Sequence, residues 1–412
     1  MPATRTPDRL TRIAVVGASG FVGATLVERL LARGQYTVVP LIHSTGSAWR
    51  LSRHALDLRT VELLSPEALR TALRGCTHVV NCSSGPREVM LRGLENLLGA
   101  SLAEGVQRFV HLSSVAVYGD PPPPEAVHED APTRPVRDTY GWNKLRQDQL
   151  VQAACRRGLP SVILCPPYIG GAYSMFVLRV LQAIQEGRLA LVDGGDAVIN
   201  LVDVQNLAQA IELALSCATA DAQRLFVNDD AGTTWRQFTS PLVDLAGRPK
   251  PLPSISRDEA SGWLGSVKTA PSTLGRRMKR LIASHQVRTI LQEDPLITKL
   301  FQLTRSGIRF LPGGARERLD GILRPPKRRR PRAVHPAFDE RLCRLQLRGL
   351  RHACDRAREV LGYHPEVSFA GSMEAFQAWY RTTNGWGAEY APLFEELLRT
   401  PAAPKGGDAA EM

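Results

Sequence analysis

The sequence lacks the features of a secreted or membrane-spanning protein. Its seven cysteines are scattered and never form a CxxC pair, which argues against a disulfide framework and against a zinc site. No run of about 18 apolar residues is present, and residues 1–12 have no apolar core like that of a signal peptide. We therefore expect a cytoplasmic protein with reduced cysteines and no metal.

Acidic residues are scarce relative to basic ones. The 412 residues carry a formal charge of +12, and the stretch 271–330 holds 15 Lys and Arg against 4 Asp and Glu. Such a basic block suits nucleic acid, an anionic membrane surface or an acidic substrate, and it also suits a plain solvated face. Nucleic acid is disfavoured, because the proline-interrupted basic run 324–332 has no interleaved aromatic residues and no recognisable binding module.

The first informative pattern is a strand followed by glycines and a helix. Residues 12–16 are an apolar, β-branched run typical of a buried parallel strand, and an amphipathic helix with several leucines follows the glycines. Glycines three residues apart let backbone N–H groups approach a pyrophosphate at the helix N-terminus. We expect a dinucleotide to bind here, with contacts from Gly17, Ser19, Gly20, Phe21, Val22 and Gly23.

The second predicted strand, 37–42, ends at His43 without an acidic residue. A dinucleotide site commonly uses an acid at this strand end for a free ribose 2′-hydroxyl, and a cation for a 2′-phosphate. His43 and the two hydroxyl residues after it can donate hydrogen bonds, and Arg50 and Arg53 are close in sequence. We expect NADP as the cofactor. In the alternative, NAD is bound and His43 only caps the strand.

Strands and helices continue to alternate beyond this point. Strands are predicted at 78–81 and 108–112, and helices at 65–73 and 88–104. This pattern predicts an α/β fold, a Rossmann-type doubly wound parallel sheet with ligands at the carboxyl ends of its strands. Asp57 and Leu58 fall where a loop of such a sheet can contact the adenine.

A candidate proton-transfer group follows the predicted strand 108–112. Ser114 stands just after that strand, and Tyr140 and Lys144 are four residues apart, so a helix would place both on one face. An ammonium near a phenol favours the phenolate and lowers the phenol pKa. The spacing alone also fits a helix with a half-buried tyrosine and a solvated lysine.

The combination resembles a known family. The glycine motif at 17–23, the stretch 112–119 and the Tyr140-xxx-Lys144 pair are similar in type, order and spacing to those of the extended short-chain dehydrogenases/reductases, the NAD(P)-dependent epimerase/dehydratase group. The resemblance covers 11–144 and resumes over 353–379. It implies that Tyr140 is the catalytic acid/base, that Lys144 holds the nicotinamide ribose, and that Ser114 orients the substrate oxygen. Pro167 would also contact the cofactor.

Departures from the family pattern narrow the reaction. Val115 and Ala116 replace the Asp-Glu pair of members that eliminate water, so a dehydratase is not expected. Tyr168 and Asp196 replace the Asn and Arg that hold a substrate diphosphate in nucleotide-sugar epimerases, and Asp196 would repel that group. Met90 replaces an Asn of the fourth helix. Tyr168, together with Tyr173, could line the substrate pocket or serve packing.

Domain boundaries are expected from composition and from the resemblance. We expect a dinucleotide-binding domain at 11–250, with part of the substrate pocket at 165–200, then a basic insertion at 251–338, a C-terminal substrate-lobe segment at 339–400 and a disordered tail at 401–412. Within the insertion, 273–303 reads as a basic amphipathic helix. It could contact an anionic membrane, cover the substrate as a lid or join two copies in a homodimer.

The leading functional hypothesis is an NAD(P)-dependent oxidoreductase that acts on a small molecule, with Tyr140 exchanging the proton on the substrate oxygen. The missing diphosphate ligands and the basic insertion favour a substrate that is apolar or carried on a lipid. A nucleotide-sugar epimerase is the alternative reaction. A cofactor-binding regulator without turnover is a third possibility, but it would not need Ser114, Tyr140 and Lys144.

Overall fold

The computed structural model describes residues 11–217, 221–229, 232–248, 251–266 and 338–384. The chain divides into two compact units, 1–257 together with 338–412, and 258–337. The site discussed below lies in the first unit. The amphipathic segment predicted at 273–303, and the tail predicted at 401–412, lie outside the described residues.

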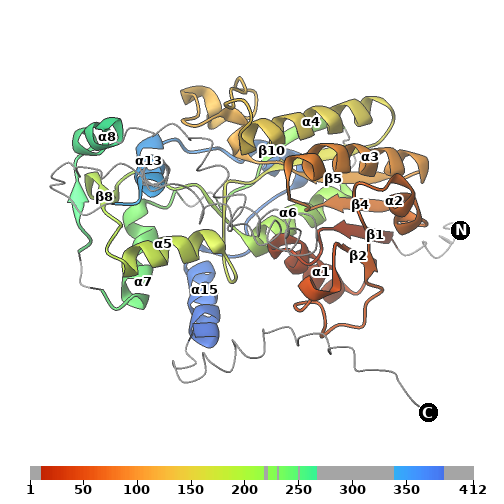
Figure 1. Cartoon of the computed structure of the whole chain (residues 1–412), viewed down its shortest axis with the longest axis horizontal. Coiled ribbons are helices and arrows are strands. Elements are labelled where there is room, and N and C mark those ends of the chain that lie inside the picture. Colours follow the sequence, from red (N-terminus) through yellow and green to blue (C-terminus); the bar gives the residue numbers. More distant parts are fainter. Residues whose placement is uncertain (1–10, 218–220, 230–231, 249–250, 267–337, 385–412) are drawn as a thin grey trace, which may run out of the picture. The chain divides into compact units, whose positions relative to one another are not determined.

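A parallel sheet of seven strands forms the centre of the described part of the first unit (Figure 1). Its strand order is β10-β6-β5-β4-β1-β2-β3, so the order reverses between β1 and β4, where a doubly wound fold binds its ligands. The strands are β1 (Thr11–Val16), β2 (Tyr36–Ile42), β3 (Arg59–Thr60), β4 (His78–Asn81), β5 (Arg108–Leu112), β6 (Ser161–Cys165) and β10 (Asp221–Phe226). The expected doubly wound Rossmann-type sheet is confirmed.

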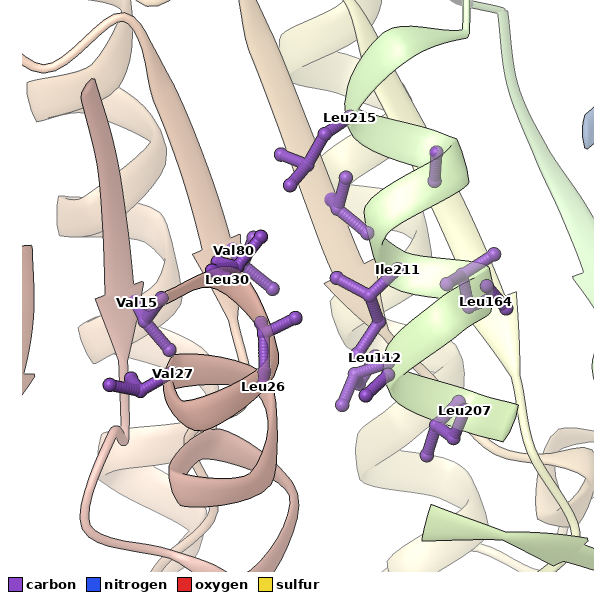
Figure 2. Packing of buried hydrophobic residues seen from close by; sticks show 14 of the residues in the cluster. Val15, Leu26, Val27, Leu30, Val80, Leu112, Leu164, Leu207, Ile211 and Leu215 are labelled. Atoms are coloured by element: carbon purple, nitrogen blue, oxygen red, sulfur yellow. The ribbon is translucent and has the colours of Figure 1, made fainter. Parts of the chain in front are cut away.

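Helices cover both faces of this sheet (Figure 1). One face carries α1 (Phe21–Arg33), α6 (Val204–Ser216) and the short α14 (Asp355–Leu361); the other carries α2 (Pro66–Leu73), α3 (Leu94–Ala103) and α4 (Tyr140–Arg156). Figure 2 shows aliphatic side chains of α1 and α6, with Leu26, Leu30, Leu207 and Ile211 among them, packed beside valines and leucines of the sheet. These side chains are almost completely buried, and their burial supplies the main stabilisation of the layer.

A second hydrophobic cluster builds the smaller lobe of the same unit. Its helices are α5 (Met175–Gln185), α7 (Trp235–Leu245), α13 (Glu340–Arg348) and α15 (Phe369–Asn384), with the short strands β7 (Tyr168–Gly170), β8 (Leu191–Val192), β9 (Leu201–Asp203) and β11 (Ser254–Ile255). The helix α8 (Arg257–Ser266) follows β11 in sequence. The remaining elements are short helical turns. Four are 3₁₀ turns, Thr45–Ser47, Val115–Tyr118, Pro124–Val127 and Asp193–Gly195, and one, Val89–Gly93, is a π-helical turn.

The predicted element boundaries differ from the structure at a few places. The helix predicted at 88–104 begins as one π-helical turn, Val89–Gly93, and continues as α3. Residues 201–203 form β9, and Asp203 then caps α6, because its carboxylate accepts the N–H of Gln205 at 2.7 Å. None of the described helices is long and apolar enough to cross a bilayer.

Candidate active site

The glycine loop between β1 and α1 has the close backbone packing that a dinucleotide site requires. Gly17 has φ +76°, and a Cβ there would lie 3.0 Å from the backbone of Ser83 after β4. A Cβ on Gly23 would lie only 2.2 Å from the carbonyl oxygen of Gly17. Gly20 caps α1 without any side chain, so the helix N-terminus is left open to an anionic group. These residues therefore fit a dinucleotide pyrophosphate.

The loop after β2 borders the same region. The Ser47 hydroxyl donates to the Ser19 hydroxyl at 3.0 Å, which joins this loop to the glycine loop. His43 is exposed, and its Nε2 lies 3.7 Å from a Glu62 carboxylate oxygen. Arg50 does not supply a free cation: its side chain is only 9% exposed, and it is paired with Glu28 at 3.1 Å. Of the two arginines noted in the sequence, only Arg53 is largely exposed, and it too contacts Glu28.

Tyr140 is the first residue of α4, which Thr139 caps by accepting the N–H of Trp142. The next residue, Gly141, packs directly on the turn that follows β5, since a Cβ there would lie 2.2 Å from the carbonyl oxygen of Ala116. That turn begins at Ser114, whose hydroxyl accepts the Ala116 N–H at 3.2 Å. The close approach of helix and turn brings Tyr140 and Ser114 to the same place.

Lys144 lies one helical turn further along α4 and is almost completely buried. Its ammonium donates to the carbonyl oxygen of Leu112, the last residue of β5, at 2.8 Å. It stands 5.8 Å from the centre of the Tyr140 ring. Burial lowers the pKa of Lys144 to about 8, and the nearby carboxylate of Asp148 opposes this shift.

The pKa of Tyr140 differs from the sequence-based expectation. Half of its surface is exposed (52%), yet the surrounding protein still raises the pKa of the phenol by desolvating the phenolate, with the Ser114 hydroxyl acting in the opposite direction. The Lys144 ammonium is directed at the Leu112 carbonyl oxygen, and the lowered pKa expected for Tyr140 is not found.

A cavity of about 310 Å³ opens beside these groups. Ser114, Tyr140 and Pro167, all predicted from the sequence, border it. Most of its remaining wall is apolar and comes from both lobes: Val115, Ala116, Pro122, Pro135, Val136, Val198, Ile199, Leu345 and Leu350. The arrangement places a proton-transfer group at a pocket suited to a mainly apolar molecule.

Two of the three charged side chains in this cavity wall form an ion pair. Arg348 of α13 pairs with Asp120 at 2.6 Å and donates to the Tyr168 hydroxyl at 3.3 Å. Of the two roles left open for Tyr168, the structure shows both: its side chain borders the cavity, and its ring stacks on Phe176 with centres 4.2 Å apart. Arg341, in the first turn of α13, also borders the cavity.

Other predicted residues lie elsewhere. Tyr173 does not border the cavity and packs between Trp49 and Trp379. Asp196 was expected to repel a substrate diphosphate, but this prediction was wrong: Asp196 is outside the cavity wall, and Arg236 neutralises it at 2.8 Å.

Asp57 and Leu58, which were predicted to contact the adenine, make other contacts in the structure, and so does Met90. Asp57 is held by Arg59 at 2.7 Å, and Arg12 lies 3.6 Å away, so its carboxylate serves an ion pair at the sheet edge. Leu58 packs on the main core. Met90 is buried, and its carbonyl oxygen accepts the Gln147 amide at 2.7 Å.

Sequence reasoning missed several residues of the site. Gly141 carried a signal, because it follows Tyr140 directly, but its role depends on a contact with Ala116 that spacing does not show. Asp120, Arg348 and His352 come together from distant segments. Arg348 and His352 lie just before the stretch 353–379, and that position was the only available hint.

The fold and the site together define a dinucleotide-dependent enzyme with a tyrosine beside a substrate cavity. The NAD dependent epimerase/dehydratase family matches residues 13–227, and the chain belongs to that family. It is thus an NAD(P)-dependent enzyme of the extended short-chain dehydrogenase/reductase type, as the motifs predicted.

Relatives of known activity include reductases. The chain is 29% identical over 248 residues to the 4-hydroxy-2-methyl-3-oxo-4-farnesyl-3,4-dihydroquinoline-1-oxide ketoreductase of Stigmatella aurantiaca, covering 57% of this chain and 73% of that one. It is 24% identical over 318 residues to a 2-alkyl-3-oxoalkanoate reductase of Shewanella oneidensis, covering 71% and 76%. Among solved structures, the UDP-glucuronic acid 4-epimerase of Bacillus cereus in complex with NAD has a TM-score of 0.59 and 17% identity, over 90% of this chain and 99% of that one.

Proposed function

We propose that the protein transfers hydride between a nicotinamide dinucleotide and a carbonyl or hydroxyl carbon of a mainly apolar small molecule. The observation that carries the proposal is the cavity, in which Ser114 and Tyr140 face a wall built largely of aliphatic side chains. Two relatives are reductases of keto compounds, and the name of one of them includes a farnesyl group. Both features suit an apolar substrate better than a free nucleotide sugar.

The roles of the site residues follow from their positions. Gly17, Ser19, Gly20, Phe21, Val22 and Gly23 would hold the pyrophosphate at the start of α1, and Pro167 would contact the nicotinamide end. When bound, the nicotinamide ring supplies or accepts the hydride. Ser114 would hold the substrate oxygen by a hydrogen bond, and Tyr140 would give or take the proton on that oxygen.

Lys144 would act on both the cofactor and the tyrosine. Its ammonium is already fixed by Leu112, which leaves its other two N–H groups for a ribose and for Tyr140. Its pKa of about 8 means that it still carries a proton for most of the time at neutral pH. A cation so placed favours the phenolate of Tyr140 once the three groups are bridged.

We propose NADP as the preferred dinucleotide. The end of β2 has no acidic residue, His43 is exposed there, and the Ser19 and Ser47 hydroxyls lie side by side at the loop. Arg53 is the cation available to a 2′-phosphate, because its side chain is largely exposed, whereas that of Arg50 is buried, although both contact Glu28. Asp57 and Leu58 would meet the adenine only by leaving their present contacts, so they are the weakest members of the predicted set.

The substitution Tyr140→Phe tests the central assignment. It removes only the hydroxyl, so dinucleotide binding should change little while turnover falls by about 10² or more. Turnover would be followed by NADPH absorbance with a 2-alkyl-3-oxoalkanoate, a 3-ketosteroid and UDP-glucose. Near-full activity of the variant would remove Tyr140 from the mechanism.

The same panel separates the two candidate reactions. Net consumption of NADPH with one of the ketones supports the oxidoreductase. Saturable micromolar binding of UDP-glucose, with conversion of the sugar and no net change in cofactor, would favour the epimerase instead. The structures of epimerases share this fold, so the fold by itself does not choose between the reactions.

A membrane role of the insertion 251–338 is part of the proposal and rests on sequence. The segment 273–303 is basic and amphipathic, and each cation near an anionic surface contributes about 1 kcal/mol. Sedimentation with anionic and neutral vesicles would compare the full chain with a variant lacking 274–303. Equal partitioning of both proteins on both vesicles would exclude membrane contact and leave a lid or a homodimer contact for this segment.

A further inference from the structure

One polar side chain in the cavity wall has no part in the hydride and proton transfer described above. His352 lies in the connection between α13 and α14, with a side chain only 4% exposed, and it borders the cavity that Ser114 and Tyr140 also border. A buried imidazole at a substrate cavity is either a packing element or a recognition group. Its contacts decide between the two.

The backbone of His352 is held rigidly from two sides. Its N–H donates to the Asn200 side-chain oxygen at 2.9 Å, and its carbonyl oxygen accepts the Asn228 amide at 2.6 Å. Its ring packs against Phe226 of β10, with ring centres 4.8 Å apart. The imidazole is thus fixed in place before any ligand binds.

One ring nitrogen is already used, and this sets the state of the other. The Nδ1 atom lies 2.6 Å from the carbonyl oxygen of Ala126. A carbonyl oxygen can only accept, so Nδ1 carries the proton. In the neutral ring Nε2 then bears a lone pair and can only accept a hydrogen bond.

The second nitrogen has no partner within the described part of the chain, and it is not enclosed. In that part of the chain, some side-chain nitrogens, such as Nε2 of His111 and Nε1 of Trp235, have neither a hydrogen-bond partner nor contact with solvent. Nε2 of His352 is not one of these sealed atoms. The open space that His352 borders is the substrate cavity. The free acceptor is therefore accessible from that cavity.

The charge of the ring agrees with this assignment. Burial lowers the pKa of His352, the Ala126 hydrogen bond opposes the shift, and the positive charge of Arg348 adds to it. Arg348 and its partner Asp120 border the same cavity, and Arg341 borders it too, so these three are the charged groups that line the cavity with the ring. Near neutral pH the imidazole is uncharged and presents an acceptor.

We propose that His352 is a specificity-determining residue whose Nε2 accepts a hydrogen bond from a hydroxyl or N–H group of the substrate. This inference rests on the proposed function in so far as the cavity is the substrate site. It narrows the substrate from an apolar molecule to one that also carries a donor away from the reacting carbon. A pocket built around a buried acceptor disfavours an analogue without the donor, because the acceptor then loses water without gaining a partner.

The experiment uses binding, so it does not depend on turnover. The full chain, with histidine labelled by ¹⁵N and no added dinucleotide, is titrated with cyclohexanol and with methoxycyclohexane, which has no donor. We expect the His352 Nε2 resonance to be that of an unprotonated nitrogen and to move with cyclohexanol only. We also expect about a tenfold preference for cyclohexanol over the ether.

Two substitutions separate recognition from packing. In His352→Asn the side-chain amide can still donate to Ala126 but no longer reaches the position of Nε2, so the variant should fold and lose the preference for cyclohexanol. In His352→Gln an amide oxygen can replace Nε2 while the Ala126 contact is lost, so the preference should remain in a less stable protein.

If His352→Asn kept the preference for cyclohexanol and His352→Gln lost it, His352 would only pack the structure. A protonated Nε2 in the unmodified chain, or equal binding of both fragments by that chain, would also overturn the proposal. If these binding results hold but no ketone is turned over, only the proposed reaction fails.

Discussion

The contact between α4 and the turn after β5 allows a quantitative prediction for Gly141→Ala. The added methyl group would start 2.2 Å from the carbonyl oxygen of Ala116, whereas ordinary contacts of a Cβ begin at 3.4 Å. The added Cβ is fixed to the backbone of α4, and the atom that it meets is backbone of the turn. The start of α4 must therefore move away from the turn by about 1 Å. Such a displacement separates Tyr140 from Ser114, and misplacement of this size in an active site costs about 10² in rate.

The strain should also appear in stability. Overpacking against a rigid neighbour costs about 1–3 kcal/mol. The matched control is Gly99→Ala on the exposed side of α3, where an added Cβ meets nothing within 4 Å. That substitution should raise the free energy of unfolding by about 0.5–1 kcal/mol, because alanine is the better helix former, and it should leave activity unchanged.

Thermal unfolding by circular dichroism and turnover with the most active ketone of the panel measure both effects. Dinucleotide affinity should fall much less than turnover, because the glycine loop lies on another element. A Gly141→Ala protein with activity within about twofold of the unmodified chain, and with an unchanged melting temperature, would refute the reasoning.

Three further predictions concern charge. His43→Asp should narrow or reverse the preference for NADPH over NADH in fluorescence titrations, and a clear preference of the unmodified chain for NADH would contradict the assignment at the end of β2. Burial raises the pKa of Asp229 to about 7, so the folded chain binds this proton more tightly than the unfolded chain. The contribution of Asp229 to stability is therefore greatest below the unfolded pKa of about 4 and is lost as the pH rises towards 7, by an amount on the order of a few kcal/mol. The free energy of unfolding in urea would be measured against pH for the unmodified chain and for Asp229→Asn. The difference between the two curves should show this loss of stability with rising pH, and identical curves would refute it. Asp120→Asn should free Arg348 and strengthen UDP binding several-fold by calorimetry, whereas an unchanged affinity would show that the ion pair does not control access of anions.

Much of the fold could be predicted from short local patterns in the sequence. The parallel strands β4 and β5 are each built around two adjacent apolar residues, Val79-Val80 and Phe109-Val110, and both ends of each strand were predicted correctly. The cap of α6 by Asp203 is also a local feature, since it needs only an acidic side chain two residues before the N–H that it accepts. The π-helical turn before α3 has no such signal, because it depends on how that segment packs against α4.

The parts of the candidate site that could be predicted are those that follow from residue type and spacing along the chain. Tyr140, Ser114 and the glycine loop could be found because each needs a fixed residue type at a fixed distance along the chain. The state of Tyr140 was not predictable in the same way. Its pKa depends on where the Lys144 ammonium points, and the carbonyl oxygen of Leu112 that holds it is contributed by the backbone of another element.

The charge of the substrate cavity shows why composition is a poor guide to a site. The chain carries an excess of +12, and the sequence suggested that Asp196 would be the group to repel an anionic substrate. The structure instead neutralises Asp196 with Arg236 outside the cavity and pairs Arg348 with Asp120 inside it, across 228 positions of sequence. A mainly apolar substrate remains the proposal, because most of the wall is apolar and the Arg348 cation, already bound to a carboxylate, attracts a diphosphate only weakly, which leaves Arg341 as the other cation of the wall.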